Sequence, residues 1–121
     1  MSSGTSRWRI LNDALQSVLP RYDAAMDMGL VLFPAGSGSS TEPLCNTVVP
    51  LRLSPTRRGA GGLLGVLGAT TPSGRTPTAA ALQVTQRYFS EHPMPGRVRA
   101  AVLATDGAPN CNAALDGSRC V

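Results

Sequence analysis

Apolar and polar positions follow one another along the chain in patterns that predict three helices. Across residues 8–19 the apolar side chains return every three or four positions with polar residues between them, as in an amphipathic helix. We expect Pro20 to end this helix, because proline has no backbone N–H. A shorter helix, weakened by glycines, is predicted over 58–67. Residues 76–90 predict a further helix with Thr76 as its N-cap, because the proline that follows suits the first helical position.

Continuous apolar runs predict the strands. Residues 28–33 and 98–104 are apolar at nearly every position, as in strands covered on both faces of a parallel sheet. Residues 47–53 predict another strand, and Pro50 assigns it to a sheet edge because proline cannot donate to a ladder. The order of these elements predicts an α/β fold. We expect a Rossmann-like, doubly wound, mostly parallel sheet with helices on both faces, in one domain over residues 1–121.

Composition supports a folded chain with an aliphatic core. Of the 121 residues, 42% are hydrophobic, which argues against disorder, and only 4% are aromatic. The formal net charge is +4, and all eleven basic residues are arginines. They are spread along the chain rather than clustered, so base composition of the genome explains them better than a nucleic-acid surface does. No nucleic-acid partner is expected.

Several kinds of catalytic or binding site are excluded by residues that the chain lacks. Without lysine there is no P-loop, and without a Gly-x-Ser-x-Gly elbow there is no α/β-hydrolase nucleophile. His92 is the only histidine, which argues against a His-rich zinc site and leaves no nucleophile–base pair. We therefore do not expect an enzyme.

The cysteines leave two interpretations open. Cys111 and Cys120 bracket a polar loop, so a local disulfide is plausible in an oxidising compartment. The alternative is two free thiols or a pair of metal ligands, and Cys45 has no partner in either case. The N-terminus shows no signal peptide, and no apolar run is long enough to span a membrane.

Two short stretches each place one oxygen ligand at the edge of a predicted element. Thr76 offers a hydroxyl at a helix start, and Asp106 offers a carboxylate where a strand ends. Hydroxyl and carboxylate oxygens suit Mg²⁺, Mn²⁺ or Ca²⁺, so the pair could form half of a cation site. Two ligands alone would hold such an ion weakly. Each residue also has a plain structural interpretation, Thr76 as an N-cap and Asp106 as part of a turn.

These stretches resemble the von Willebrand factor type A domain. The segment Gly-Arg-Thr-Pro-Thr at 74–78 and the Thr-Asp-Gly at 105–107 are similar to the second and third segments of that family's metal-ion-dependent adhesion site. The resemblance implies that Thr76 and Asp106 contact the metal. It further implies a protein partner that presents an acidic side chain to the cation. The amino-acid sequence of residues 105–112 is especially similar to that of secreted or surface bacterial members of the family. This similarity implies an extracytoplasmic or cell-surface parent protein.

The first metal segment of the family, Asp-x-Ser-x-Ser, has no counterpart in this chain. One alignment matches Met1 to a methionine just after that segment. A second places Met1 at the aspartate itself, with Ser3 and Thr5 as hydroxyls. Both lack the aspartate. The resemblance therefore implies a fragment truncated at both ends, without the first central strand and the C-terminal elements.

The resulting expectation is a metal-ion-dependent adhesion or protein-interaction module whose Mg²⁺ (or Mn²⁺ or Ca²⁺) site is weak or absent in this fragment. Two alternatives remain open. The chain could belong to an accessory subunit of a metal-inserting or ATPase-driven enzyme complex, or it could be a non-functional fragment.

Overall fold

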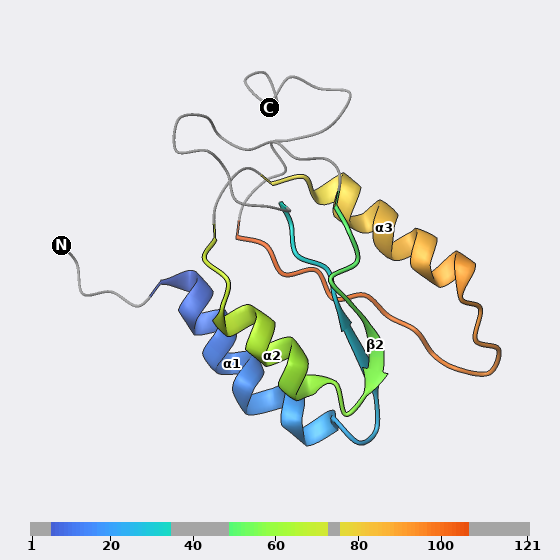
Figure 1. The fold of residues 1–121 in the computed structure, drawn as a ribbon, viewed down its shortest axis with the longest axis horizontal. Coiled ribbons are helices and arrows are strands. Elements are labelled where there is room, and N and C mark those ends of the chain that lie inside the picture. Colours follow the sequence, from blue (N-terminus) through green and yellow to red (C-terminus); the bar gives the residue numbers. More distant parts are fainter. Residues whose placement is uncertain (1–5, 35–48, 73–75, 107–121) are drawn as a thin grey trace. The chain divides into compact units, whose positions relative to one another are not determined.

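The computed structural model describes residues 6–34, 49–72 and 76–106. Its elements in chain order are α1 (Arg7–Tyr22), β1 (Asp27–Leu30), β2 (Leu53–Arg57), α2 (Ala60–Gly68) and α3 (Thr78–Glu91) (Figure 1). They belong to two compact units. The first unit comprises Met1–Leu30 and Arg52–Pro72, and the second comprises Val31–Leu51 and Ser73–Val121.

Helix α1 forms where the apolar spacing predicts it, but it does not end at Pro20. The Ser6 side chain accepts a hydrogen bond from the Arg9 amide at 3.2 Å and caps the N-terminus. Pro20 lies inside the helix, which continues to Tyr22. A proline so near the end removes only one backbone hydrogen bond from the last turns, so the helix tolerates it. The predicted boundary at Pro20 was therefore wrong by two residues.

Helix α2 carries the core of the first unit. Ala60, Leu63 and Leu67 are buried at 2%, 6% and 3% exposure, and they lie on one face because they are three and four residues apart. This helix contacts both α1 and β1 (Figure 1). Two side chains of α1 reach the end of α2: the Trp8 indole N–H donates to the Thr70 carbonyl at 3.1 Å, and the Asn12 amide donates to the Leu67 carbonyl at 3.4 Å.

The two described strands pair antiparallel, which overturns the predicted fold class. Asp27 lies opposite Arg57, and Leu30 lies opposite Leu53. The described residues therefore contain a two-stranded antiparallel sheet and three helices, and not the doubly wound parallel sheet expected from the apolar runs. An apolar run indicates that a strand is covered, but it carries no information about the direction of its partner. Here oppositely charged Asp27 and Arg57 meet across the strands at 3.0 Å, which favours the antiparallel register.

The pairing contains an irregularity that explains Gly29. Between the Met28 and Leu30 pairs the register slips, so that Ser54 and Pro55 together oppose Gly29. A Cβ on Gly29 would lie 2.7 Å from the Leu53 carbonyl oxygen and 2.9 Å from Pro55 Cδ. Because the backbone of β2 comes this close to Gly29, a residue with a side chain would clash, and only glycine fits. The predicted strand at 47–53 with Pro50 at an edge was misplaced, since β2 begins at Leu53 and contains Pro55; residues 47 and 48 lie outside the described residues.

The third predicted strand, over residues 98–104, is not a strand in the structure. The segment has neither helix nor turn and pairs with no described strand. Its apolar side chains were expected to be buried, yet Val98 and Val102 are 99% and 94% exposed. A run of this composition becomes a buried strand only where neighbouring strands and covering layers exist, and the described part of the chain supplies none for it.

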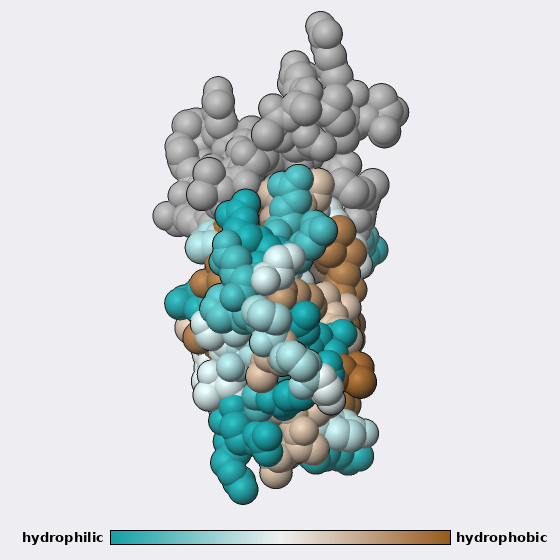
Figure 2. Space-filling model, turned by 90° about the vertical axis from the view of Figure 1, so that its right-hand side faces the viewer, coloured by the Kyte–Doolittle hydropathy of each residue, from teal (hydrophilic) through white to brown (hydrophobic). Residues whose placement is uncertain are grey.

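Helix α3 dominates the described part of the second unit. It runs over the range predicted from the sequence, with its start two residues later than Thr76. Thr78 and Ala81 are buried, whereas Leu82 is 47% exposed. On the face of the molecule drawn in Figure 2, hydrophobic residues occur in small groups separated by hydrophilic ones.

Candidate metal-ion site and the two ends of α3

Thr76 lies just before α3 and is not its N-cap. The N-cap is Pro77, whose ψ of 64° is not helical, so the first helical residue is Thr78. The Thr76 carbonyl accepts a hydrogen bond from the Thr78 amide at 3.0 Å, and Thr76 itself is half-buried. The predicted N-cap role was therefore wrong by one residue, because the proline occupies that position. Pro77 offers no side-chain acceptor, and α3 has no acidic residue in its first turn.

Asp106 lies on the exposed end of the segment that follows α3. It directly follows the 98–104 run and Thr105, and it belongs to the same compact unit as Thr76. Thr76 and Asp106 each have an interaction partner in the structure. A cation beside Thr76 would also face the partial positive charge of the α3 N-terminus, so a carboxylate such as that of Asp106 would be needed to offset it.

Other ligands for a metal are scarce in the parts of the chain that are described. Across residues 6–34, 49–72 and 76–106, no three His, Cys, Asp or Glu side chains gather closely enough to hold an ion. Mg²⁺ prefers six oxygen ligands and keeps several waters, so a hydroxyl and one carboxylate would bind it only weakly. The tentative disulfide partners Cys111 and Cys120 lie outside the described residues.

A buried hydroxyl at the start of α3 escaped the sequence analysis. Thr78 is 7% exposed, and its Oγ1 atom is buried without a hydrogen-bond partner. An unsatisfied buried hydroxyl costs about 1–3 kcal/mol of stability. The sequence offers no signal for this, because threonine in a first helical turn is usually exposed or hydrogen-bonded.

The C-terminal end of α3 is held by a basic side chain from the segment that follows it. The Arg99 guanidinium donates to the carbonyls of Phe89 and His92 at 2.7 and 2.9 Å, and its central carbon lies 4.9 Å from the centre of the Phe89 ring. A cation at this end of a helix satisfies carbonyls that lack intrahelical donors and interacts favourably with the helix dipole. His92, the only histidine, stacks on Tyr88 with 4.2 Å between ring centres, and its Nδ1 lies 3.0 Å from the Tyr88 carbonyl.

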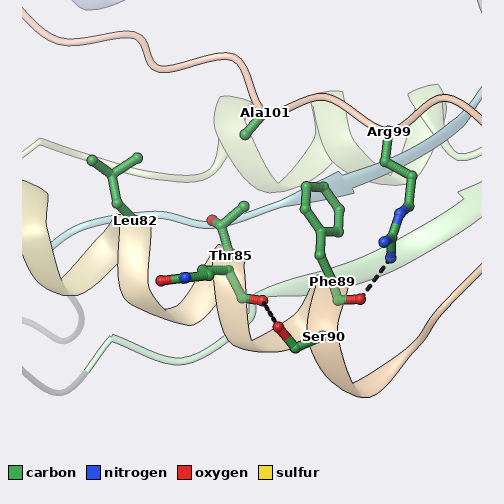
Figure 3. A pocket seen from close by; sticks show the side chains of 7 residues that line it. Leu82, Thr85, Phe89, Ser90, Arg99 and Ala101 are labelled. Atoms are coloured by element: carbon green, nitrogen blue, oxygen red, sulfur yellow. Dashed lines mark hydrogen bonds between the residues drawn. The ribbon is translucent and has the colours of Figure 1, made fainter.

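An open recess lies between α3 and this following segment (Figure 3). It has a volume of about 380 Å³, and Phe89, Arg99 and Ala101 point toward it from its two sides. Both hydroxyls that line it already have partners: the Thr85 hydroxyl donates to the Ala81 carbonyl, and the Ser90 hydroxyl donates to the Gln86 carbonyl. Hydroxyls committed to the helix backbone do not select a ligand, so the recess does not define a small-molecule site.

Comparison of the chain with protein-family models, with characterised proteins and with solved structures finds no match. Among the described residues, no helix combines the length and apolar character needed to cross a membrane.

Proposed function

We propose that the chain is part of a metal-ion-dependent adhesion or protein-interaction module related to the von Willebrand factor type A domain. The observation that carries the proposal is the pair of segments around Thr76 and Asp106, with Thr-Pro opening a helix and Thr-Asp-Gly following an apolar run. Thr76 is half-buried and Asp106 is exposed, and both belong to the second unit. A hydroxyl and a carboxylate of this kind suit Mg²⁺ or Mn²⁺, to which a partner would contribute an acidic side chain.

The proposed site is weak on its own. Two protein ligands leave four of the six positions around Mg²⁺ to water or to the partner. We therefore expect a dissociation constant for Mg²⁺ or Mn²⁺ on the order of millimolar, which corresponds to about 4 kcal/mol of binding free energy. A partner carboxylate would tighten binding by adding a charged ligand, so the adhesion partner and the cation would bind cooperatively.

Calorimetric titration with Mn²⁺ tests the site. We expect binding near the millimolar range that is lost in Asp106→Asn and weakened in Thr76→Val. Asp13→Asn is the matched control, since Asp13 is an exposed aspartate on α1 in the other unit, and it should leave binding unchanged. A dissociation constant for Mn²⁺ below the millimolar range, with binding lost in Asp106→Ala, would contradict the expectation that the site is weak. Binding that is equal in Asp106→Asn and Asp13→Asn would refute the proposed function.

A further inference from the structure

Arg99 anchors the segment after α3 to the C-terminal end of that helix. Its Nη1 atom donates to the Phe89 carbonyl at 2.7 Å and to the His92 carbonyl at 2.9 Å, so one nitrogen bridges two carbonyls at the helix end. The guanidinium carbon also lies 4.9 Å from the centre of the Phe89 ring. The segment cannot slide along the helix without breaking these contacts, so Arg99 fixes its position there.

From this anchor the segment runs back along α3. Ala101, which follows Arg99 closely in the sequence, lines the recess together with Leu82 and Thr85 (Figure 3). Both of these helical residues lie before Phe89, nearer to the start of α3. In Figure 1 the orange trace after α3 likewise runs toward the end at which the helix begins. The segment is therefore directed opposite to the helix, and it leads from the Arg99 anchor toward the N-terminal end of α3.

The chain after Ala101 is long enough to bring Asp106 to that end. Five residues separate Ala101 from Asp106, and such a length of extended chain spans about 17 Å at most. Along the helix, Leu82 lies only about 6 Å from the first helical residue, Thr78. Thr76 lies just before this first turn, in the same compact unit. How far Asp106 reaches along α3 is thus set by where the segment is anchored.

We propose that Arg99 is a positioning residue for the cation site. By holding the segment at the C-terminal end of α3, it fixes where the Asp106 carboxylate lies relative to the Thr76 hydroxyl at the opposite end. This inference rests on the proposed function and deepens it, because it assigns a role to a side chain that does not itself contact the ion. Arginine has no lone pair to offer a metal, so its contribution can only be indirect.

Charge and position make opposite predictions for the loss of Arg99. A guanidinium repels a cation, so its removal would strengthen Mn²⁺ binding if charge alone mattered. If Arg99 acts by holding the segment, its removal frees the Asp106 carboxylate and weakens binding. Groups that hold metal ligands by direct hydrogen bonds contribute about 10- to 100-fold in affinity. Arg99 acts through the chain rather than on a ligand, so we expect an effect of about five- to tenfold.

Calorimetric titration with Mn²⁺ of Arg99→Met tests this role. Methionine keeps an unbranched apolar stem but has no donor for the two carbonyls, and it should weaken binding by about five- to tenfold. Arg99→Lys keeps a charged donor without the planar fork and should recover part of the affinity. Arg87→Met is the matched control, since Arg87 is exposed on α3 in the same unit, and it should leave binding unchanged or slightly tighter. Circular dichroism melts set a temperature at which all variants are folded.

Nuclear Overhauser effects recorded without any cation test the anchor separately. The contact between the Ala101 and Leu82 methyl groups should be lost in Arg99→Met and kept in Arg87→Met. An unchanged contact in Arg99→Met would overturn the inference, and so would Mn²⁺ binding that stays equal to wild type or becomes tighter. In those cases the proposed function still stands, because the wild type binds. A wild-type chain that binds no Mn²⁺ would instead refute the proposed function, and the positioning role of Arg99 with it.

Discussion

Asp23 joins the end of one helix to the start of the next, and its removal tests how the first unit is held together. It is the C-cap of α1, yet its Oδ1 atom accepts a hydrogen bond from the Ala60 amide at 2.9 Å. Its carbonyl accepts from the Arg58 amide at 3.1 Å. The N-cap of α2 is Gly59, which has no side chain to offer, and the first turn of α2 contains no acidic residue. Asp23, which is far from α2 in the sequence, therefore supplies the N-terminal capping group that the residues next to α2 do not offer.

The expected cost of Asp23→Ala is the balance of three effects. Ala60 is only 2% exposed, so its amide would lose its partner away from water, at about 1–3 kcal/mol. The favourable interaction of the carboxylate with the N-terminus of α2 adds about 0.3–1 kcal/mol, and its repulsion from the C-terminus of α1 subtracts a similar amount. The two dipole effects nearly cancel, so the hydrogen bond decides. We expect a loss of about 1–3 kcal/mol in the free energy of unfolding.

Urea denaturation followed by Trp8 fluorescence measures this loss. Trp8 is the only tryptophan, and its indole donates to Thr70 just after α2, so its emission reports the first unit. Asp23→Asn keeps an acceptor oxygen and should cost less than the alanine change, within about 1 kcal/mol of wild type. Asp13→Ala, at an exposed position on α1, is the control and should be neutral or slightly stabilising. If Asp23→Ala were as stable as Asp13→Ala, the distant cap would contribute nothing and the reasoning would be wrong.

Two further substitutions test features of the hairpin and of α3. Gly29→Ala should destabilise the first unit by about 1–3 kcal/mol, because the new Cβ would meet backbone of β2 at 2.7 Å; an unchanged urea midpoint by Trp8 fluorescence would contradict that close approach. Thr78→Val should leave the melting temperature unchanged or raise it, because it removes a buried hydroxyl that has no partner; a clear fall in a calorimetric scan would show that the hydroxyl is satisfied after all.

Much of the local structure follows from the sequence pattern. The three described helices appear where apolar spacing predicts them, because that spacing depends on the chain's own helical period. Their ends were less predictable. Pro20 lies within α1, and Pro77 takes the N-cap position that was assigned to Thr76. A helix end depends on which neighbouring group satisfies the last free backbone atoms, and such groups can come from elsewhere in the chain, as Asp23 shows for α2.

The candidate metal residues could be chosen from the sequence, but their surroundings could not. Short motifs identify Thr76 and Asp106 as oxygen donors of the right type. Whether further donors gather around them depends on segments far apart in the sequence, and no such group of carboxylate, imidazole and thiolate side chains is found in the described ranges. The same holds for Arg99, whose contacts with the end of α3 depend on how the chain turns after His92.

The sequence by itself determined the helical periods, the positions of the apolar runs and the chemical types available for a site. The tertiary structure decided the direction in which β1 and β2 pair, the bulge at Gly29, and the exposure of Val98 and Val102. The physical reason is the range of the interactions. A helix makes its hydrogen bonds within its own segment, so its signal is local, whereas a strand is completed only by another strand. The run at residues 98–104 has the composition of a buried strand, and the described part of the chain provides it with no strand partner.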